Sequence, residues 1–162
     1  MTRRAICGPL VFRDPVVLCG GLYLLLYFDA SGFLRLGLLA AILHELGHIA
    51  VYTALRRRLP VIEVTVTGFC MCTRGEQFSL GQTALLAAAG PMANLFWAAA
   101  WTVLLSQKAT VHGTAFWAAN LLTAAFNLLP VPPLDGAQLA ACLWAAVRAK
   151  NRNCNYRQNR VQ

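Results

Sequence analysis

Residues 33–55 read FLRLGLLAAILHELGHIAVYTAL, and this apolar stretch decides the fold. A helix of this length would be about 34 Å long, which is enough to cross the hydrocarbon core of a bilayer. Three consecutive arginines, Arg56 to Arg58, end it abruptly. The composition also indicates a membrane protein, because 58% of the chain is hydrophobic and only 12% is charged. Soluble domains average about 25% charged residues.

The same stretch contains the pattern His44-Glu45-Leu46-Gly47-His48. Residues four apart share one face of a helix, so the two histidines can bind one metal ion, with Glu45 beside them. In a soluble helix such a pattern forms a surface cluster of salt bridges about as often as it forms a metal site. At the centre of a span an acidic residue costs about 2.5–3.5 kcal/mol, so ionisable residues there indicate function.

Other apolar segments lie on both sides of this one: Pro15–Phe28, Leu80–Ser106 and Thr114–Val147, the last broken by Pro130-Val131-Pro132-Pro133. Between the second and third segments, the β-branched residues of 61–67 and the glycines of 68–75 predict a hairpin. We therefore expect an all-α polytopic membrane protein with about four transmembrane helices and a small membrane-associated β-hairpin. Residues 1–147 would form one membrane-embedded core, and residues 148–162 a basic, disordered cytoplasmic tail.

The basic residues predict the orientation. With four spans and a cytoplasmic N-terminus, all Lys and Arg residues except Arg35 and Lys108 lie on the cytoplasmic side, as the positive-inside rule requires. This bias accounts for the net charge of +8. A nucleic-acid partner is not expected, because the sequence has no basic amphipathic helix and no interleaving of aromatic and basic residues.

Two histidines need at least one more protein ligand, and Asp135 is the only acidic residue within another apolar segment. Its helical distance from Arg148 is about 20 Å, and the two histidines lie about 12–18 Å from the arginines that end their own span. The three groups can therefore meet at similar depth. Two imidazoles and one carboxylate with an open position are typical of a catalytic zinc site, at which Glu45 would accept a proton from the attacking water.

Three motifs in this order resemble the site-2 proteases, and in particular the short bacterial branch that includes a sporulation protease. They are His44-Glu-Leu-Gly-His48, Gly90-Pro-Met-Ala-Asn94 and Asn127-Leu-Leu-Pro130-Val-Pro-Pro-Leu-Asp135-Gly136. The resemblance implies one zinc ion bound by His44, His48 and Asp135.

The resemblance also implies roles for other residues. Glu45 is the expected catalytic acid and base, and Asn127 is expected to position the substrate or its oxyanion. Gly68 and Phe69 resemble part of a hairpin that holds an extended substrate, and Asn94 is a further expected substrate contact. Gly90 is expected to allow close helix packing.

The resemblance implies an intramembrane metalloendopeptidase in a bacterial cell membrane, with its active site toward the cytoplasm and a membrane protein as substrate. We expect a bare catalytic core without a regulatory domain, so that any regulation would come from a partner membrane protein. Two alternatives stay open, a non-proteolytic metal-binding protein or transporter and a scaffold. A transporter would carry ionisable residues along a path, whereas this chain concentrates them in one cluster.

Overall fold

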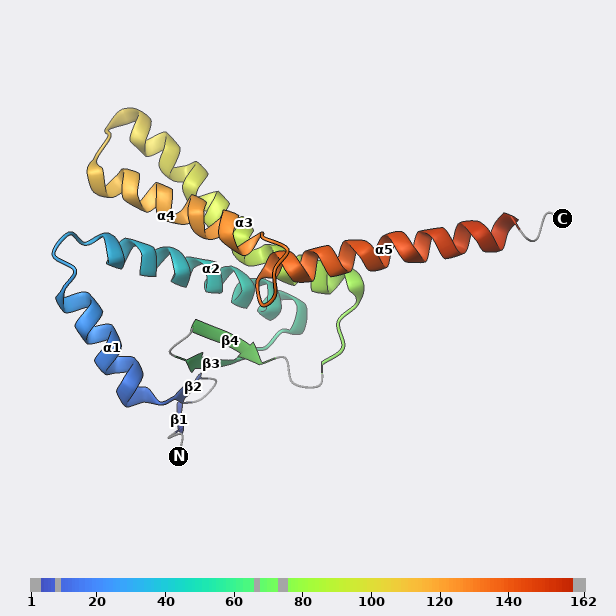
Figure 1. Ribbon diagram of the computed structural model, residues 1–162, viewed down its shortest axis with the longest axis horizontal. Coiled ribbons are helices and arrows are strands. Elements are labelled where there is room, and N and C mark those ends of the chain that lie inside the picture. The colour runs from blue at the N-terminus through green and yellow to red at the C-terminus, as the bar shows by residue number, and fades with distance from the viewer. Residues whose placement is uncertain (1–3, 8–9, 66–67, 73–75, 159–162) are drawn as a thin grey trace.

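The computed structural model describes residues 4–7, 10–65, 68–72 and 76–158 (Figure 1). Its elements are, in chain order, β1 (Arg4–Cys7), β2 (Leu10–Arg13), α1 (Pro15–Tyr27), α2 (Phe33–Arg56), β3 (Val61–Thr65), β4 (Gly68–Cys72), α3 (Leu80–Gln107), α4 (Val111–Asn127) and α5 (Asp135–Gln158). Helix α3 is the centre of the bundle, because it packs against α2, α4 and α5.

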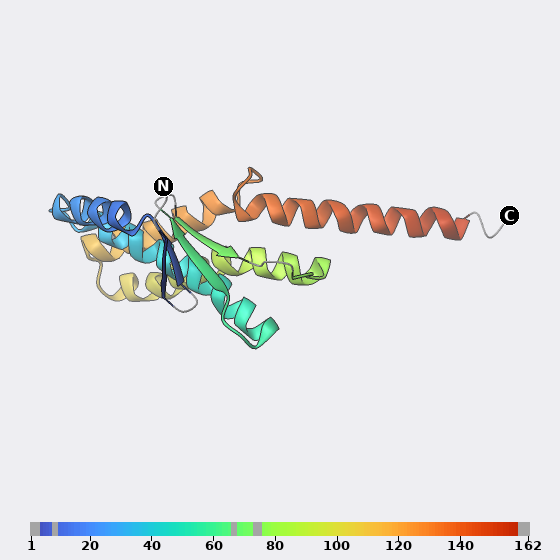
Figure 2. The same cartoon turned by 90° about the horizontal axis from the view of Figure 1, so that it is seen from below.

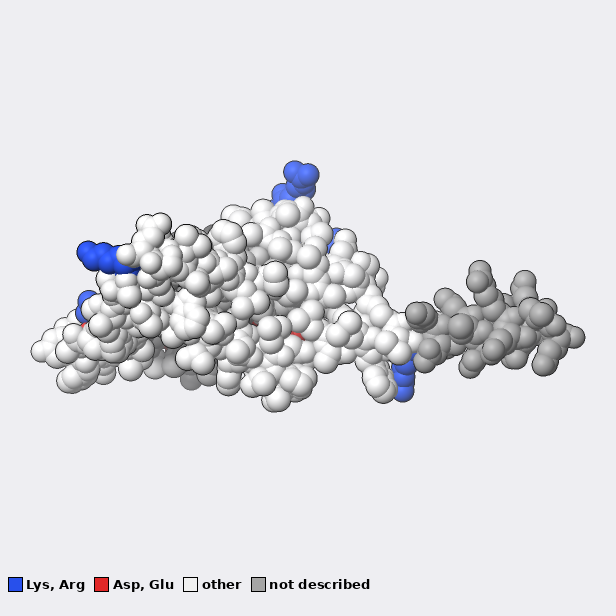
Figure 3. All heavy atoms as spheres, turned by 90° about the horizontal axis from the view of Figure 1, so that it is seen from above, with Lys and Arg blue, Asp and Glu red and all other residues white. Residues whose placement is uncertain are grey.

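Small side chains fill the contacts between these helices. The buried alanines of the bundle are Ala40, Ala87, Ala89, Ala98 and Ala124. Small residues let helix backbones approach closely, which drives helix association where lipid removes the hydrophobic effect. Large apolar side chains point outward instead, and much of the face in Figure 3 is uncharged.

The ends of the helices follow from local sequence. Ser79 caps α3 through a reciprocal capping box with Gln82, and Thr110 accepts from the backbone N–H of Gly113 at the start of α4. Gly32 precedes α2 with a φ of 75°, a conformation that glycine adopts without strain. The prolines at 130, 132 and 133 separate α4 from α5, because proline cannot continue a helix.

The predicted hairpin between α2 and α3 is present, with β3 and β4 antiparallel. The predicted mostly helical fold is confirmed, but the prediction of a single hairpin is incomplete, because β1 and β2 form a second hairpin and β2 pairs with β3 in parallel. The result is a four-stranded sheet in the order β1-β2-β3-β4. Strands β1 and β2 have only four residues each, which is too short to show a clear alternation in the sequence.

Two of the described helices, α2 and α3, are long and apolar enough to cross a membrane. Helix α1 has only 13 residues, and the predicted fourth span is divided into the separate helices α4 and α5. The four-span arrangement therefore stays a prediction. Helix α1 makes few contacts with α2 and leaves most of its apolar side chains exposed.

Helix α5 leaves the bundle and continues alone to Gln158 (Figure 2). This differs from the disordered tail that we expected from residue 148, and only residues 159–162 of that segment lie outside the described residues. The reason is that extending an existing helix is far easier than nucleating one, and Arg, Lys and Gln have good helix propensity.

Candidate metal centre

One face of α2 carries both histidines into the bundle. Ala40, His44, His48 and Tyr52 are the buried residues of this helix, and they recur at intervals of four. Only 4% of His44 and 8% of His48 is exposed. The sequence pattern thus places two imidazoles, one turn apart, against the neighbouring helices.

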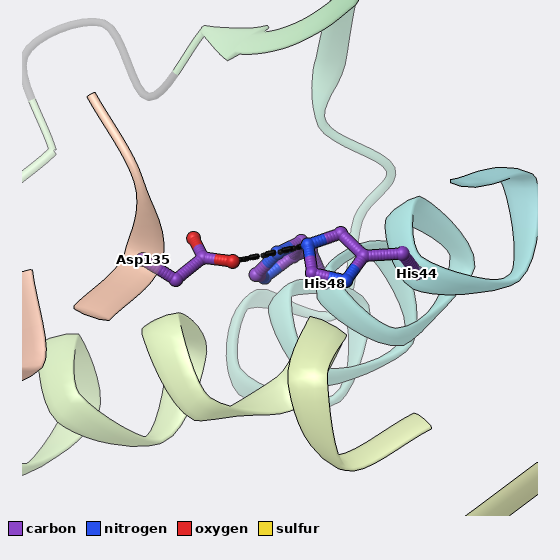
Figure 4. Close-up of side chains that lie close together, drawn as sticks. All are labelled: His44, His48 and Asp135. Carbon is purple, nitrogen blue, oxygen red and sulfur yellow. Dashed lines mark hydrogen bonds and ion pairs between the residues drawn. The ribbon is translucent and has the colours of Figure 1, made fainter. Parts of the chain in front are cut away.

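Asp135 completes a tight cluster with these imidazoles (Figure 4). Its Oδ2 atom lies 3.0 Å from Nε2 of His44 and 3.2 Å from Nε2 of His48, and the two Nε2 atoms are 3.2 Å apart. Ligand atoms around a tetrahedral zinc ion, at about 2.0–2.1 Å from the metal, are separated from each other by about 3.3 Å. The three atoms therefore have the spacing of three corners of a zinc tetrahedron.

The hydrogen bonding of His48 supports this reading. Its Nδ1 atom lies 2.8 Å from the carbonyl oxygen of Leu86 on α3, so Nδ1 is the protonated nitrogen and donates to that carbonyl. In neutral imidazole the other nitrogen then carries a lone pair. Nε2 of His48 and the Asp135 carboxylate are both acceptors at 3.2 Å, an arrangement that a shared cation stabilises.

Gly90 of α3 lies directly against the cluster. A Cβ atom at this position would be 2.3 Å from Nε2 of His48 and 2.6 Å from Nε2 of His44. We expected Gly90 to allow helix packing, but its closest contacts are the ligand atoms themselves. The close approach of α2 and α3 depends instead on Gly47, where a Cβ would be 2.6 Å from the carbonyl oxygen of Ala89. The glycine within the HELGH motif was the signal for this contact.

Asp135 is the first residue of α5. Its position at the helix N-terminus favours a carboxylate, because the free backbone N–H groups there carry partial positive charge. The proline-containing loop folds back onto this turn, and a Cβ at Gly136 would be 2.2 Å from the carbonyl oxygen of Leu128. Gly136 therefore lets the loop and the helix meet at the ligand.

Replacing Gly136 with Ala is expected to reduce the free energy of unfolding by about 1–3 kcal/mol, because the added methyl group overlaps backbone atoms that cannot rotate away. The thermal midpoint of the purified protein in detergent measures this loss. Gly37→Ala is the control, since nothing lies within 4 Å of its Cβ position. Equal midpoints for the two variants would contradict the assigned contact.

Glu45 is half-buried and close enough to interact electrostatically with His44, His48 and Asp135. It is not one of the three residues whose ligand atoms cluster. A carboxylate beside a metal site but outside its ligand set is suited to proton transfer.

The structure places the other predicted site residues elsewhere. Asn94 has no exposed surface, and its Nδ2 donates to the carbonyl oxygen of Ala40 at 3.1 Å. It therefore joins α3 to α2 and is not available to a substrate, contrary to our expectation. Nδ2 of Asn127 donates to the carbonyl oxygen of Thr123 within α4, so a catalytic role for Asn127 stays a prediction. Gly68 and Phe69 open strand β4.

Comparisons with known proteins agree with this fold. The sequence model of peptidase family M50 matches residues 106–162. Among solved structures, the site-2 protease from Methanocaldococcus jannaschii is similar, with a TM-score of 0.61 and 17% identity over 90% of this chain and 73% of that chain. No curated protein matches the sequence. The structural similarity shows the fold, and with the M50 match it confirms the resemblance to the site-2 proteases.

Proposed function

We propose that this chain, which has the fold of the site-2 proteases and a C-terminal third that matches peptidase family M50, is an intramembrane zinc metalloendopeptidase. The observation that carries the proposal is the convergence of His44, His48 and Asp135, whose ligand atoms lie within 4.8 Å of one another. They come from two helices that are far apart in sequence. Burying ionisable groups among apolar helices costs free energy of desolvation, so such a cluster indicates a function.

The chain supplies the parts of a hydrolytic site. His44, His48 and Asp135 would hold the ion, and zinc fits two imidazoles and one carboxylate. A zinc ion there supplies a Lewis acid that polarises a peptide carbonyl. The Glu45 carboxylate would accept a proton from the attacking water as the new C–O bond forms. It would then return that proton to the nitrogen of the leaving amine as the peptide C–N bond breaks.

Strand β4 supports binding of an extended substrate. It lies at one end of the sheet order, so one of its edges has no partner among the described strands. An added peptide strand can pair with such an edge through its main chain. A transmembrane helix hides its amides and must unwind before cleavage. Gly68 and Phe69 at the start of β4 are therefore our proposed substrate contacts, and a membrane protein is the proposed substrate.

The lengths and apolar surfaces of α2 and α3 support a location in a membrane. The arginines at 56–58, on the end of α2 nearer to His48, support an active site toward the cytoplasm. We also propose, on the basis of the family resemblance, that the membrane is a bacterial cell membrane and that a partner membrane protein controls cleavage.

Metal analysis tests the proposal directly. Purified protein is expected to hold about one zinc ion per chain, and chelation is expected to reduce cleavage of unfolded casein at least tenfold, because the Lewis acid is lost. Restored cleavage after addition of zinc excludes simple unfolding. Metal binding without any cleavage would instead favour a non-proteolytic metal-binding protein.

A further inference from the structure

A second cluster of polar side chains lies beyond the metal centre, at the end of α2. Glu76, which follows the hairpin in sequence, accepts a hydrogen bond from the hydroxyl of Tyr52 at 2.8 Å. Its second oxygen lies 2.9 Å from Nε of Arg56, and Arg58 pairs with the first oxygen. Only 13% of the Glu76 side chain is exposed, so one carboxylate joins three side chains at the end of this helix.

The residues after Glu76 strengthen the attachment. Nη2 of Arg56 donates to the carbonyl oxygen of Gln77 at 2.7 Å. The Arg56 guanidinium also lies 4.3 Å from the centre of the Phe78 ring, a cation–π contact. Phe78 in turn faces Tyr52, with ring centres 6.2 Å apart. The segment from Glu76 to Phe78 is thus held to the end of α2 along its length.

This attachment fixes one of the two connections between the β3–β4 hairpin and the helices. Strand β3 follows α2 through the fully buried Pro60, and β4 leads to α3 through the segment that contains Glu76. Among the described residues the strands contact mainly one another, and they contact the helices little. The position of β4 relative to α2 and α3 therefore depends on these two connections, together with the link from β2 to α1.

The cluster is also linked to the metal centre through α2. Tyr52 lies one turn after His48 on the same buried face, so Glu76 binds the face that carries the ligands. On the far side of the segment, α3 begins at Leu80 and supplies the Leu86 carbonyl that orients His48. The segment from Glu76 to Phe78 thus contacts α2 directly and leads into α3, and these two helices flank the metal centre.

We propose that Glu76 is a positioning residue, which clamps the β4 edge at a set distance from the metal centre so that a bound strand presents its peptide bond there. The inference rests on the proposed function for its catalytic consequence. The clamp itself is a property of the contacts between Glu76 and α2.

The clamp is expected to hold at neutral pH. The Tyr52 hydrogen bond, and then the ion pairs with Arg58 and Arg56, outweigh the effect of burial and lower the pKa of Glu76. A lowered pKa means that the stabilisation is complete above the ordinary glutamate pKa of about 4.3 and is lost as the pH falls through the lower value. Physiological changes in pH therefore leave the clamp closed.

Amide hydrogen exchange of the full chain in detergent tests the clamp without reference to activity. Glu76→Gln is expected to speed exchange in β3 and β4 at least about tenfold, because it removes the negative charge that pairs with Arg56 and Arg58. Arg58→Gln is expected to speed the same exchange. Because the Arg58 side chain is mostly exposed, this variant tests the clamp with little risk of misfolding. Asp29→Asn is the matched control, since Asp29 pairs with Arg35 at the opposite end of α2.

Cleavage of unfolded casein then tests the positioning role. Glu76→Gln is expected to raise KM severalfold with little change in kcat, because the chemical groups are intact and strand binding is weakened. Cobalt binding, measured by visible absorption, is expected to be the same for Glu76→Gln and for the unmodified protein. Unchanged exchange, or a fall in kcat with unchanged KM, would overturn the proposal. A complete lack of cleavage by the unmodified protein would instead overturn the proposed function and leave the exchange result standing.

Discussion

Replacing Glu45 with Gln is expected to slow peptide cleavage by about 10²–10⁴-fold, the usual contribution of a general acid–base residue. The amide has nearly the same size as the carboxylate but cannot accept the proton of the attacking water. The metal ligands are untouched, because the ligand atoms come from His44, His48 and Asp135. Zinc content measured alongside the cleavage rate should therefore stay near one ion per chain.

The neighbouring Leu46 offers a matched control for this experiment. Half of its surface is exposed, at 50%, and it lies next to Glu45 on the same helix. Leu46→Ala is expected to cleave at nearly the rate of the unmodified protein, because substitutions of exposed side chains usually have small effects. Retained cleavage in Glu45→Gln would contradict the proposed mechanism, whereas loss of zinc from this variant would show that Glu45 has a structural role at the site.

Gly90→Ala is expected to have the second large effect. The added methyl carbon would lie 2.3 Å from Nε2 of His48, so the imidazoles or α3 must move by more than 1 Å. A displacement of about 1 Å can cost about 100-fold in rate when reacting groups lose their alignment. We expect zinc affinity and cleavage to fall together, because the clash involves the ligand atoms themselves.

Gly81→Ala provides the comparison for Gly90→Ala. Gly81 lies on the same helix, and no other atom lies within 4 Å of its Cβ position. Titration of the zinc-free proteins with zinc should give the unmodified affinity for Gly81→Ala and a much weaker one for Gly90→Ala. Similar affinities for the two variants would show that the imidazoles can move aside, and that Gly90 is not required at the site.

The residues of the candidate metal site were predictable because they follow from local sequence patterns. Spacing by four put His44 and His48 on one helix face, and the scarcity of acidic residues in apolar segments singled out Asp135. The structure brings these three residues together. The hairpin after α2 was also predictable, since its β-branched residues interrupt a helical pattern.

The predictions that failed depend on contacts between distant parts of the chain. Asn94 belongs to a motif, but only the packing of α3 on α2 shows that it has no exposed surface. Strands β1 and β2 have too few residues to be recognised alone, and they are extended because β3 provides a partner for β2. Helix α5 continues past residue 148 because a helix is easily extended from its existing end.

The sequence by itself determined the apolar helices α2 and α3 and the identity of the residues that can bind a metal, because hydropathy and helical periodicity are properties of neighbouring residues. Only the tertiary structure decided that Gly90 lies against the ligand nitrogens, that Glu76 binds the end of α2, and that β4 is left at the edge of a four-stranded sheet. Each of these depends on the distance between atoms far apart in the chain, which the packing of the helices sets and no local pattern encodes.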